Sequence, residues 1–320
     1  MESIPVTEVS TRTEQRETHV AIVTGAGHGI GRATALQLAA EGAHVVVNDI
    51  SEGPGGVPSA EVTAGEIRDA GGSAVAVTAS VADESGVERI LDCAVEAFGT
   101  VDAVVNNAGI FRQVDFENET LDGFLGVINV HLVGSFLLAR GAWPLLQKSQ
   151  HPRLVNVVSV SGLYGQPRMA AYSAAKAGLV GLTKTLALDG AEFGINVNAV
   201  APAAQTGDVR TAEGARFLSP LGERRTPEHA AALIAYLASP ACEVTGRGYV
   251  SAGGRYARFA LGEARGWTSE HADPPRFAHL TERFSEVDDP AVIACPSDIE
   301  ASMKLVASTS SANKAESTRA

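Results

Sequence analysis

The sequence predicts an α/β protein in which a parallel sheet carries helices on both faces, a doubly wound architecture. Short, apolar, β-rich runs alternate with helical patterns from about residue 20 to residue 250. This alternation indicates βαβ units, whose right-handed crossovers place the helices on both sides of the sheet. The 320 residues, 45% of them hydrophobic, suffice for one large core. We expect ligands to bind at the carboxyl ends of the strands, as is usual in such sheets.

The elements follow in a regular order. Apolar runs such as VAIVT, which opens the series, predict strands at 20–24, 43–48, 73–78, 102–105, 153–158, 195–200 and 247–250. Helical periodicity, as in RATALQLAAEG after the first strand, predicts helices at about 29–41, 59–70, 83–98, 118–149, 171–192 and 227–238. Two loops stand out. The segment 51–59 is rich in Gly and Pro, and the long polar segment 202–226 is typical of an active-site lid.

The segments outside this pattern divide the chain into four parts. Residues 1–18 are polar and are expected to be a disordered arm, which leaves 19–255 as a single α/β domain. Residues 256–300 form a C-terminal extension that contains several aromatic side chains among polar ones. Residues 301–320, rich in Ala, Ser and Lys, are expected to be a disordered tail.

A glycine-rich turn joins the first strand to the first helix. It reads Gly25-Ala26-Gly27-His28-Gly29-Ile30-Gly31. Glycines let backbone N–H groups approach a pyrophosphate, whose negative charge the helix N-terminus favours. Strand, glycine turn and helix together predict a dinucleotide-binding site. Its candidate residues are Gly25, Gly27, His28, Gly29, Ile30 and Gly31.

An acidic residue ends the second strand and bears on the choice of dinucleotide. The run AHVVVND places Asp49 18 residues after Gly31. A carboxylate there accepts hydrogen bonds from a ribose 2′-hydroxyl and repels a 2′-phosphate. The residue favours NAD over NADP, although Arg32 or His28 would also suit a phosphate and Asp49 would also suit a simple turn.

Three side chains predict acid–base chemistry. Tyr172 and Lys176 are four residues apart on a predicted helix and share one face, and Ser159 precedes them. A nearby ammonium favours the phenolate, so we expect Lys176 to lower the pKa of Tyr172. Ser159 supplies a hydroxyl that holds a substrate oxygen. These groups move a proton on or off a carbonyl or carbinol, and the hydride requires a cofactor.

In this order the motifs resemble those of the classical short-chain dehydrogenase/reductase family. They are Thr24-Gly25-x-x-x-Gly29-x-Gly31, Asn106-Asn107-Ala108-Gly109, Ser159 and Tyr172-x-x-x-Lys176, and the resemblance covers about 19–255. It implies a single Rossmann-type domain that binds a nicotinamide cofactor. It implies that Tyr172 is the acid/base, that Lys176 also binds the nicotinamide ribose, and that Ser159 positions the substrate oxygen. Further cofactor contacts implied by the resemblance are Ser80, Val81, Asn107, Ala108, Gly109, Pro202 and Thr206.

Three positions depart from the family pattern: Ser80 stands where the family usually has Asp, Ala203 where it usually has Gly, and His131 where it usually has Asn. The family usually has Asn in a V-N-L pattern on the fourth helix, where it links the Lys to solvent, and this chain has Val130-His131-Leu132. Histidine donates, accepts and titrates near neutrality, so His131 would keep the relay and make it more sensitive to pH. The alternative is a core imidazole with no catalytic role.

The substrate is suggested by a narrower resemblance. Runs such as NVHLVGSFLLARGAW and SVSGLYGQ look like the dehydrogenase unit of multifunctional peroxisomal β-oxidation enzymes and their bacterial relatives. That group acts on D-3-hydroxyacyl-CoA thioesters and shares the His. A small ketone, a steroid or a polyketide intermediate remains an alternative, as does a non-catalytic NAD-binding regulatory role. Candidate pocket residues are Ser161, Tyr164 and Met169, with Phe111 and Leu163 near motif ends.

Composition excludes several classes of partner. A formal net charge of −12 argues against nucleic acid and anionic membranes. The sequence has no uninterrupted apolar run of membrane-spanning length and no apolar signal-peptide core near its start, so we expect no transmembrane helix. Cys93, Cys242 and Cys295 lack metal spacing, so no metal is expected and a reducing, cytoplasmic setting is favoured. The resemblance implies a homodimer or homotetramer formed through the helices at 118–149 and 171–192.

Overall fold

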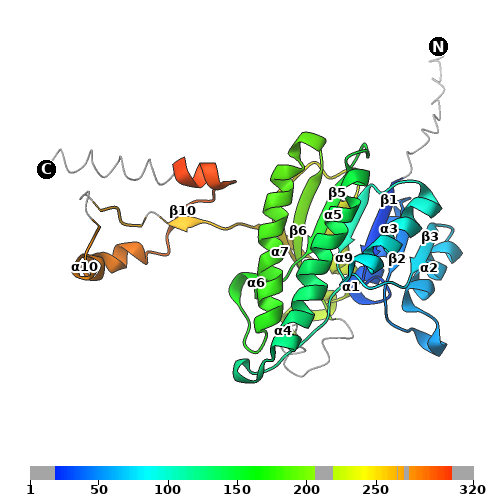
Figure 1. Ribbon diagram of the computed structural model, residues 1–320, viewed down its shortest axis with the longest axis horizontal. Helices are drawn as coiled ribbons and strands as arrows, with labels where there is room; N and C mark the ends of the chain where they lie inside the picture. Colours follow the sequence, from blue (N-terminus) through cyan, green and yellow to red (C-terminus); the bar gives the residue numbers. More distant parts are fainter. Residues whose placement is uncertain (1–18, 206–218, 265, 270–273, 305–320) are drawn as a thin grey trace, which may run out of the picture.

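The protein forms one large sheet with a helical layer on each face (Figure 1). The computed structural model describes residues 19–205, 219–264, 266–269 and 274–304. The strand order is β3-β2-β1-β4-β5-β6-β7-β8, parallel from β3 to β7. The strands are β1 Val20–Thr24, β2 His44–Asn48, β3 Ser73–Val77, β4 Ala103–Asn106, β5 Arg153–Val157, β6 Asn196–Ala203, β7 Gly248–Ala252 and β8 Arg255–Phe259. The doubly wound fold predicted from the sequence is confirmed.

The helices separate into two layers because the strands are apolar on both sides. In β1, Ile22 packs beneath α3 and α5, whereas its neighbour Val23 points to the opposite face beneath α1 and α9. Helices α1, α2 and α9 cover one face, and α3, α5 and α7 cover the other (Figure 1). The helices are α1 Gly29–Ala40, α2 Ser59–Asp69, α3 Glu84–Phe98, α4 Leu121–Ile128, α5 Gly134–Leu146, α6 Val160–Tyr164, α7 Ala170–Asp189 and α9 Pro227–Ala238.

The predicted helix at 118–149 is one continuous helix with a π-helical turn inside it. Helix α4 passes through the π-turn η3 (Asn129–Val133) into α5. Among the described residues, one helix, Leu121–Leu146, is long and apolar enough to cross a membrane, with a mean hydropathy of 1.6 in its most apolar window. A single helix of this kind is weak evidence for a membrane span, because the stretch packs on α3, α7 and β4 as a layer helix of the domain.

The C-terminal extension begins later than the sequence suggested. We placed its start at residue 256, but residues 255–259 form β8, an antiparallel edge strand of the main sheet. Gly253 and Gly254 both have positive φ (58° and 78°) and form the two-residue turn of a β7–β8 hairpin. The predicted boundary therefore falls inside a strand.

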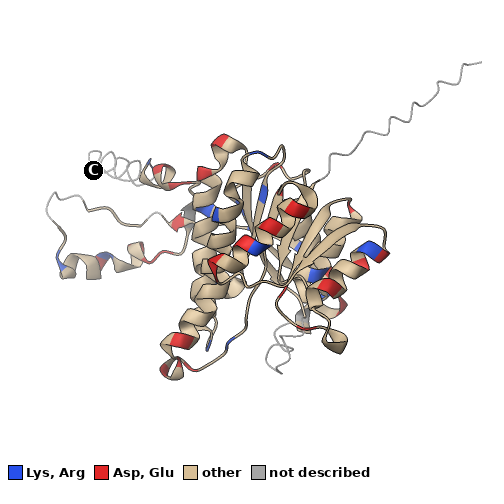
Figure 2. Cartoon of the chain, turned by 45° about the vertical axis from the view of Figure 1, so that its right-hand side comes forward, with Lys and Arg blue, Asp and Glu red and all other residues tan. Residues whose placement is uncertain are grey.

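Beyond β8 the chain leaves the sheet domain (Figure 1). Strands β9 (Glu263–Ala264) and β10 (Val292–Ala294) pair with each other, and α10 (Phe277–Val287) has no buried residue. A short helix at 299–304 includes the first residues of the predicted tail. The predicted disorder of 1–18 and 305–320, and most of the predicted lid at 202–226, lie outside the described residues. Acidic side chains are spread over the helices of both parts (Figure 2).

Candidate active site

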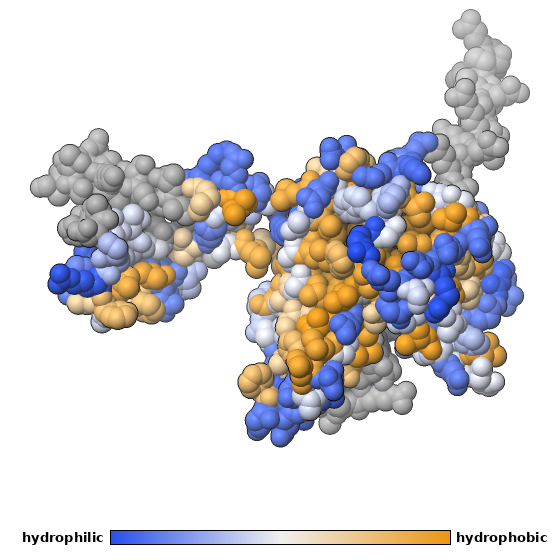
Figure 3. Space-filling view, in the orientation of Figure 1, coloured by the Kyte–Doolittle hydropathy of each residue, from blue (hydrophilic) through white to orange (hydrophobic). Residues whose placement is uncertain are grey.

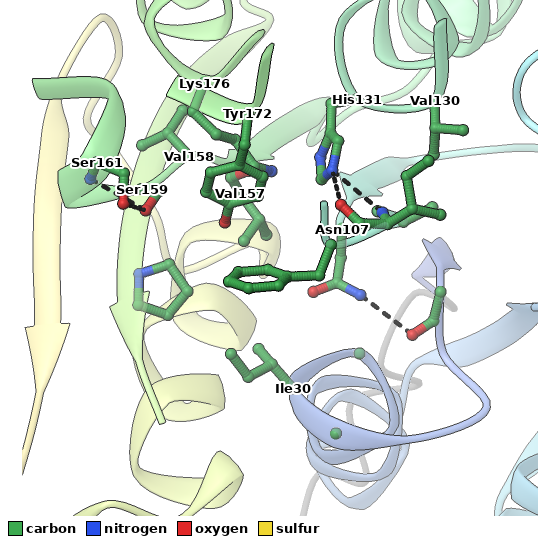
Figure 4. Close-up of a pocket in the computed structure, with 18 of the residues that line it drawn as sticks. Ile30, Asn107, Val130, His131, Val157, Val158, Ser159, Ser161, Tyr172 and Lys176 are labelled. Carbon is green, nitrogen blue, oxygen red and sulfur yellow. Dashed lines mark hydrogen bonds between the residues drawn. The ribbon is translucent and has the colours of Figure 1, made fainter. Parts of the chain in front are cut away.

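A cavity of about 740 Å³ opens at the carboxyl ends of the central strands, where the fold class predicts ligand binding. The glycine turn after β1, Asp49 after β2, and Asn107 after β4 line one part of it. Ser159 after β5, with Tyr172 and Lys176 from α7, lines another part (Figure 4). The sheet topology thus brings the predicted acid–base groups and the predicted dinucleotide site into one cavity.

The three acid–base side chains meet because β5 and α7 pack side by side. Ser159 follows β5 directly and caps α6, its Oγ accepting from the Ser161 amide at 3.2 Å. Tyr172 lies in the first turn of α7 and Lys176 one turn later on the same face. The Lys176 Nζ donates to the Val157 carbonyl at 2.5 Å and lies 5.7 Å from the Tyr172 ring centroid (Figure 4).

Burial shifts both titrating groups. It lowers the pKa of the Lys176 ammonium to about 7, because the side chain is only 3% exposed and burial disfavours its charge. Burial also raises the pKa of the Tyr172 phenol, and a hydrogen bond with Ser159 partly opposes this rise. The expectation that the pKa of Tyr172 is lowered is therefore wrong, because desolvation by burial exceeds the opposing effect of the Ser159 hydrogen bond.

His131 lies against the acid–base pair. The π-turn puts its ring edge-on to the Tyr172 ring, with centroids 5.1 Å apart. Its Nε2 lies 2.8 Å from the Ile110 carbonyl oxygen and 3.1 Å from the Ile110 amide nitrogen, so it donates to the carbonyl in one tautomer and accepts from the amide in the other. Its buried Nδ1 has no hydrogen-bond partner among the described residues. Burial and the Lys176 charge lower the pKa of His131 to about 3. The expectation that His131 titrates near neutrality is therefore wrong.

The glycine turn is packed so closely that a Cβ at Gly25 or Gly31 would meet neighbouring protein atoms. Gly25 has a φ of +61°, and a Cβ there would lie 2.8 Å from the Ala108 Cα. A Cβ on Gly31 would lie 2.1 Å from the Gly25 carbonyl oxygen and 2.5 Å from the Asn107 Nδ2. Asn107 fixes the turn by donating to the Thr24 and Gly25 carbonyls at 2.8 and 3.1 Å. A cradle of bare backbone at the start of α1 fits a pyrophosphate, as the motif predicts.

Asp49 is buried at the rim of this cradle. Its Oδ2 accepts from the Gly27 amide at 2.9 Å, and its Oδ1 accepts from the Ser51 amide and hydroxyl at 2.9 and 2.7 Å. Burial alone would raise the pKa of the carboxyl, but these hydrogen bonds and the nearby His28 ring lower it below the usual value. Asp49 is thus held as a fixed carboxylate, while the neighbouring Arg32 is paired with Glu66 at 2.5 Å.

Most other predicted contacts also lie in the cavity wall. Met169 and Leu163 do not line it: Met169, directly before α7, is 1% exposed and belongs to the packed interior. Gly27 lies behind the wall, where its amide holds Asp49, and Thr206 lies outside the described residues. The wall also contains Gln113, Gln166 and Pro167, which lie in irregular loops and which no sequence motif indicated. Predicted residues found in the wall are Gly25, His28, Gly29, Ile30, Gly31, Ser80, Val81, Asn107, Ala108, Gly109, Phe111, Ser161, Tyr164 and Pro202.

The fold and the site define an oxidoreductase of the dinucleotide-binding α/β class. The family model described as short chain dehydrogenase matches residues 19–216. The chain belongs to this family, whose members bind a nicotinamide cofactor, NAD or NADP, and act on CH–OH groups of small molecules.

Relatives match most of this chain, which spans different shares of their own lengths. A short-chain type dehydrogenase/reductase of Mycobacterium tuberculosis is 42% identical over 275 residues, which are 84% of this chain and 94% of that protein. The peroxisomal hydratase-dehydrogenase-epimerase of Saccharomyces cerevisiae is 40% identical over 84% of this chain, which spans only 30% of that larger protein. The crystal structure of a short chain dehydrogenase from Mycobacterium avium, 37% identical, superposes with a TM-score of 0.74 and covers 86% of this chain and 97% of its own.

Proposed function

We propose that this oxidoreductase uses NAD(H) to interconvert a secondary alcohol and a ketone, with Tyr172 as the acid/base. The observation that carries the proposal is the convergence of Ser159, Tyr172 and Lys176 on the cavity that also contains the glycine cradle. A non-catalytic NAD-binding role would not require these three groups at one wall of the site.

Each side chain has a distinct task in the proposed oxidation. Ser159 and Tyr172 hold the carbinol oxygen, and the Tyr172 oxygen takes its proton. The protonated Lys176 favours the phenolate electrostatically, and the Val157 carbonyl holds its Nζ in place. The bound nicotinamide supplies the hydride acceptor. The neutral His131 ring fixes the orientation of the phenol through its edge-on contact.

The removal of one oxygen atom tests this assignment. Tyr172→Phe should keep the packing against His131, because the ring stays, and should lower kcat by about 100-fold or more. Turnover is followed by NADH absorbance at 340 nm, and NADH binding by fluorescence should stay as in wild type. Tyr236→Phe, at an exposed position on α9 outside the cavity wall, is the control and should retain activity. A Tyr172→Phe enzyme with near wild-type kcat would contradict the proposal.

The preference for NAD over NADP is supported by two side chains. Asp49 is fixed as a carboxylate at the end of β2, where it would meet a 2′-phosphate. Arg32, one of the two residues that would suit such a phosphate, is paired with Glu66. Both arrangements favour a free ribose 2′-hydroxyl.

We propose an acyl thioester with a 3-hydroxyl or 3-oxo group as the substrate class. The names of two relatives support it: the yeast hydratase-dehydrogenase-epimerase, and a 3-oxoacyl-[acyl-carrier-protein] reductase of Synechocystis that is 40% identical over 240 residues. Specialised ketones such as steroids or polyketide intermediates are the alternative. A panel of 3-hydroxyacyl-CoA, steroid and simple secondary alcohols, assayed with NAD and NADP, distinguishes the two.

We also propose a cytoplasmic homodimer or homotetramer. The exposed side of the α4–α5 helix carries Leu121, Leu125 and Phe136, and apolar side chains gather over this helical layer (Figure 3). Such a face favours association. Light scattering of the purified protein gives the oligomeric state, and cell fractionation tests the location.

A further inference from the structure

Two loops form the part of the cavity wall beyond the acid–base groups. The loop at 110–119 connects β4 to α4 and contributes Ile110, Phe111 and Gln113. The loop at 165–169 connects α6 to α7 and contributes Gly165, Gln166 and Pro167. Neither loop contains the predicted cofactor residues. They are therefore placed to enclose the remainder of a substrate whose carbinol carbon lies at Tyr172.

The two loops are joined to each other at Arg168. The Val114 amide donates to the Arg168 carbonyl at 2.9 Å. The Arg168 Nε donates to the Asp115 carboxylate at 3.0 Å. Within loop 110–119, Arg112 pairs with Glu119 at 2.9 Å, which ties the loop to the start of α4. The position of one loop is thus coupled to that of the other.

Arg168 makes this connection in a strained backbone conformation. Its φ is 64°, and within the described ranges no other non-glycine residue has a positive φ. A glycine would adopt this conformation without the steric conflict of a Cβ. The Arg168 and Asp115 side chains are 49% and 55% exposed, and an ion pair so exposed adds little stability. The strain is therefore not explained by stability, and strain of this kind is typical of functional sites.

The loop that Arg168 holds also contacts the reacting centre. The Phe111 ring lies 5.7 Å from the Tyr172 ring, centroid to centroid, and the Ile110 backbone meets the His131 ring. We propose that the Arg168–Asp115 pair is a specificity latch: it holds loops 110–119 and 165–169 at a fixed separation and so sets which substrate chains fit beside Phe111. This inference rests on the proposed alcohol–ketone function. Arg168 and Asp115 are positioning residues, since neither lines the cavity.

Two measurements on one set of variants test the latch. Asp115→Ala removes the ion pair, the charge exchange Asp115→Arg with Arg168→Asp restores it in reverse, and Glu117→Ala removes an exposed carboxylate from the same loop as a control. Hydrogen–deuterium exchange, read by mass spectrometry, reports on 110–119 and 165–169 without any substrate. Steady-state kinetics with a short and a long 3-hydroxyacyl thioester report on specificity.

The latch predicts a split between binding and chemistry. Asp115→Ala should raise KM for the long substrate about three- to tenfold, leave kcat and the NADH dissociation constant within about twofold, and speed exchange in both loops. The charge exchange should reverse these changes, and Glu117→Ala should behave as wild type. Three results would overturn the latch: unchanged hydrogen–deuterium exchange in Asp115→Ala, an unchanged ratio of KM for the long substrate to KM for the short one, or failure of the charge-exchange variant to restore wild-type values. If wild type turns over none of the substrates, the proposed function fails, and exchange alone decides on the latch.

Discussion

Replacement of Lys176 by Met should stabilise the protein while it removes catalysis. Burial lowers the pKa of Lys176 from 10.5 to about 7. Between these values the unfolded chain binds more protons than the folded protein, so the free energy of unfolding rises with pH across this window. The cost of burying the charge is fully present below pH 7. The pKa difference between 10.5 and about 7, at about 1.36 kcal/mol per pH unit, corresponds to a cost of about 5 kcal/mol for burying the charged form of Lys176.

Met has a similar length and carries no charge, so it avoids this cost. It also leaves the Val157 carbonyl without its donor, which costs about 1–3 kcal/mol. We therefore expect the Lys176→Met variant to be more stable than wild type by about 2–4 kcal/mol at pH 7. The gain should shrink as pH rises, by up to about 1.4 kcal/mol per unit.

Urea unfolding at pH 7, 8 and 9, followed by circular dichroism at one protein concentration, measures both effects. The range ends below pH 10 so that the phenol of Tyr172, whose pKa burial raises, does not contribute. Lys184→Met, on the same helix, controls for the loss of a lysine as such. Parallel stability–pH curves for wild type and Lys176→Met would refute the reasoning, because they would mean that Lys176 is not destabilised by burial.

Three further variants and one control test the cofactor cradle and His131. Gly31→Ala places a methyl group 2.1 Å from the Gly25 carbonyl oxygen, so NADH affinity measured by fluorescence should fall about tenfold or more. The control Gly65→Ala, on α2, brings its Cβ only into ordinary contact with Arg68 at 3.9 Å and should instead raise stability by about 0.5–1 kcal/mol. Asp49→Asn removes the charge that would repel a 2′-phosphate, so the ratio of kcat/KM for NAD over NADP should fall about tenfold. His131→Asn should lower kcat but leave the shape of its pH profile unchanged between pH 5 and 9, because the pKa of His131 is about 3; a lost ionisation in that range would contradict this.

The parallel part of the sheet was predictable because its strands are buried on both faces. Such strands appear in the sequence as continuous apolar runs, and those at 20–24 and 43–48 match β1 and β2 closely. Strand β8 was missed because it is a half-exposed edge strand without an apolar run. Its signal was the Gly253-Gly254 pair, which is typical of a hairpin turn.

The site was predictable where chemistry requires a particular residue type. A pyrophosphate cradle requires glycine, and a Tyr–Lys pair requires helical spacing, so both were visible as motifs. Pocket walls accept many side chains, and therefore Gln166 and Pro167 were missed and Met169 was assigned wrongly. The direction of the Tyr172 pKa shift was missed for another reason: spacing shows a neighbouring cation but not the burial that opposes it.

The placement of His131 depends on a feature that residue spacing conceals. A π-turn adds one residue to a helical turn, and in an α-helix each residue rotates the following side chains by about 100°. The turn at Asn129–Val133 therefore rotates the side chains of α5 relative to those of α4. With this rotation α5 packs on β4 and the His131 ring contacts the Tyr172 ring. The freed backbone is partly satisfied by Ser135, whose hydroxyl donates to the His131 carbonyl at 2.7 Å. We therefore expect that a uniform helix over the same residues would change either the face that α5 packs on β4 or the position of the His131 ring beside Tyr172.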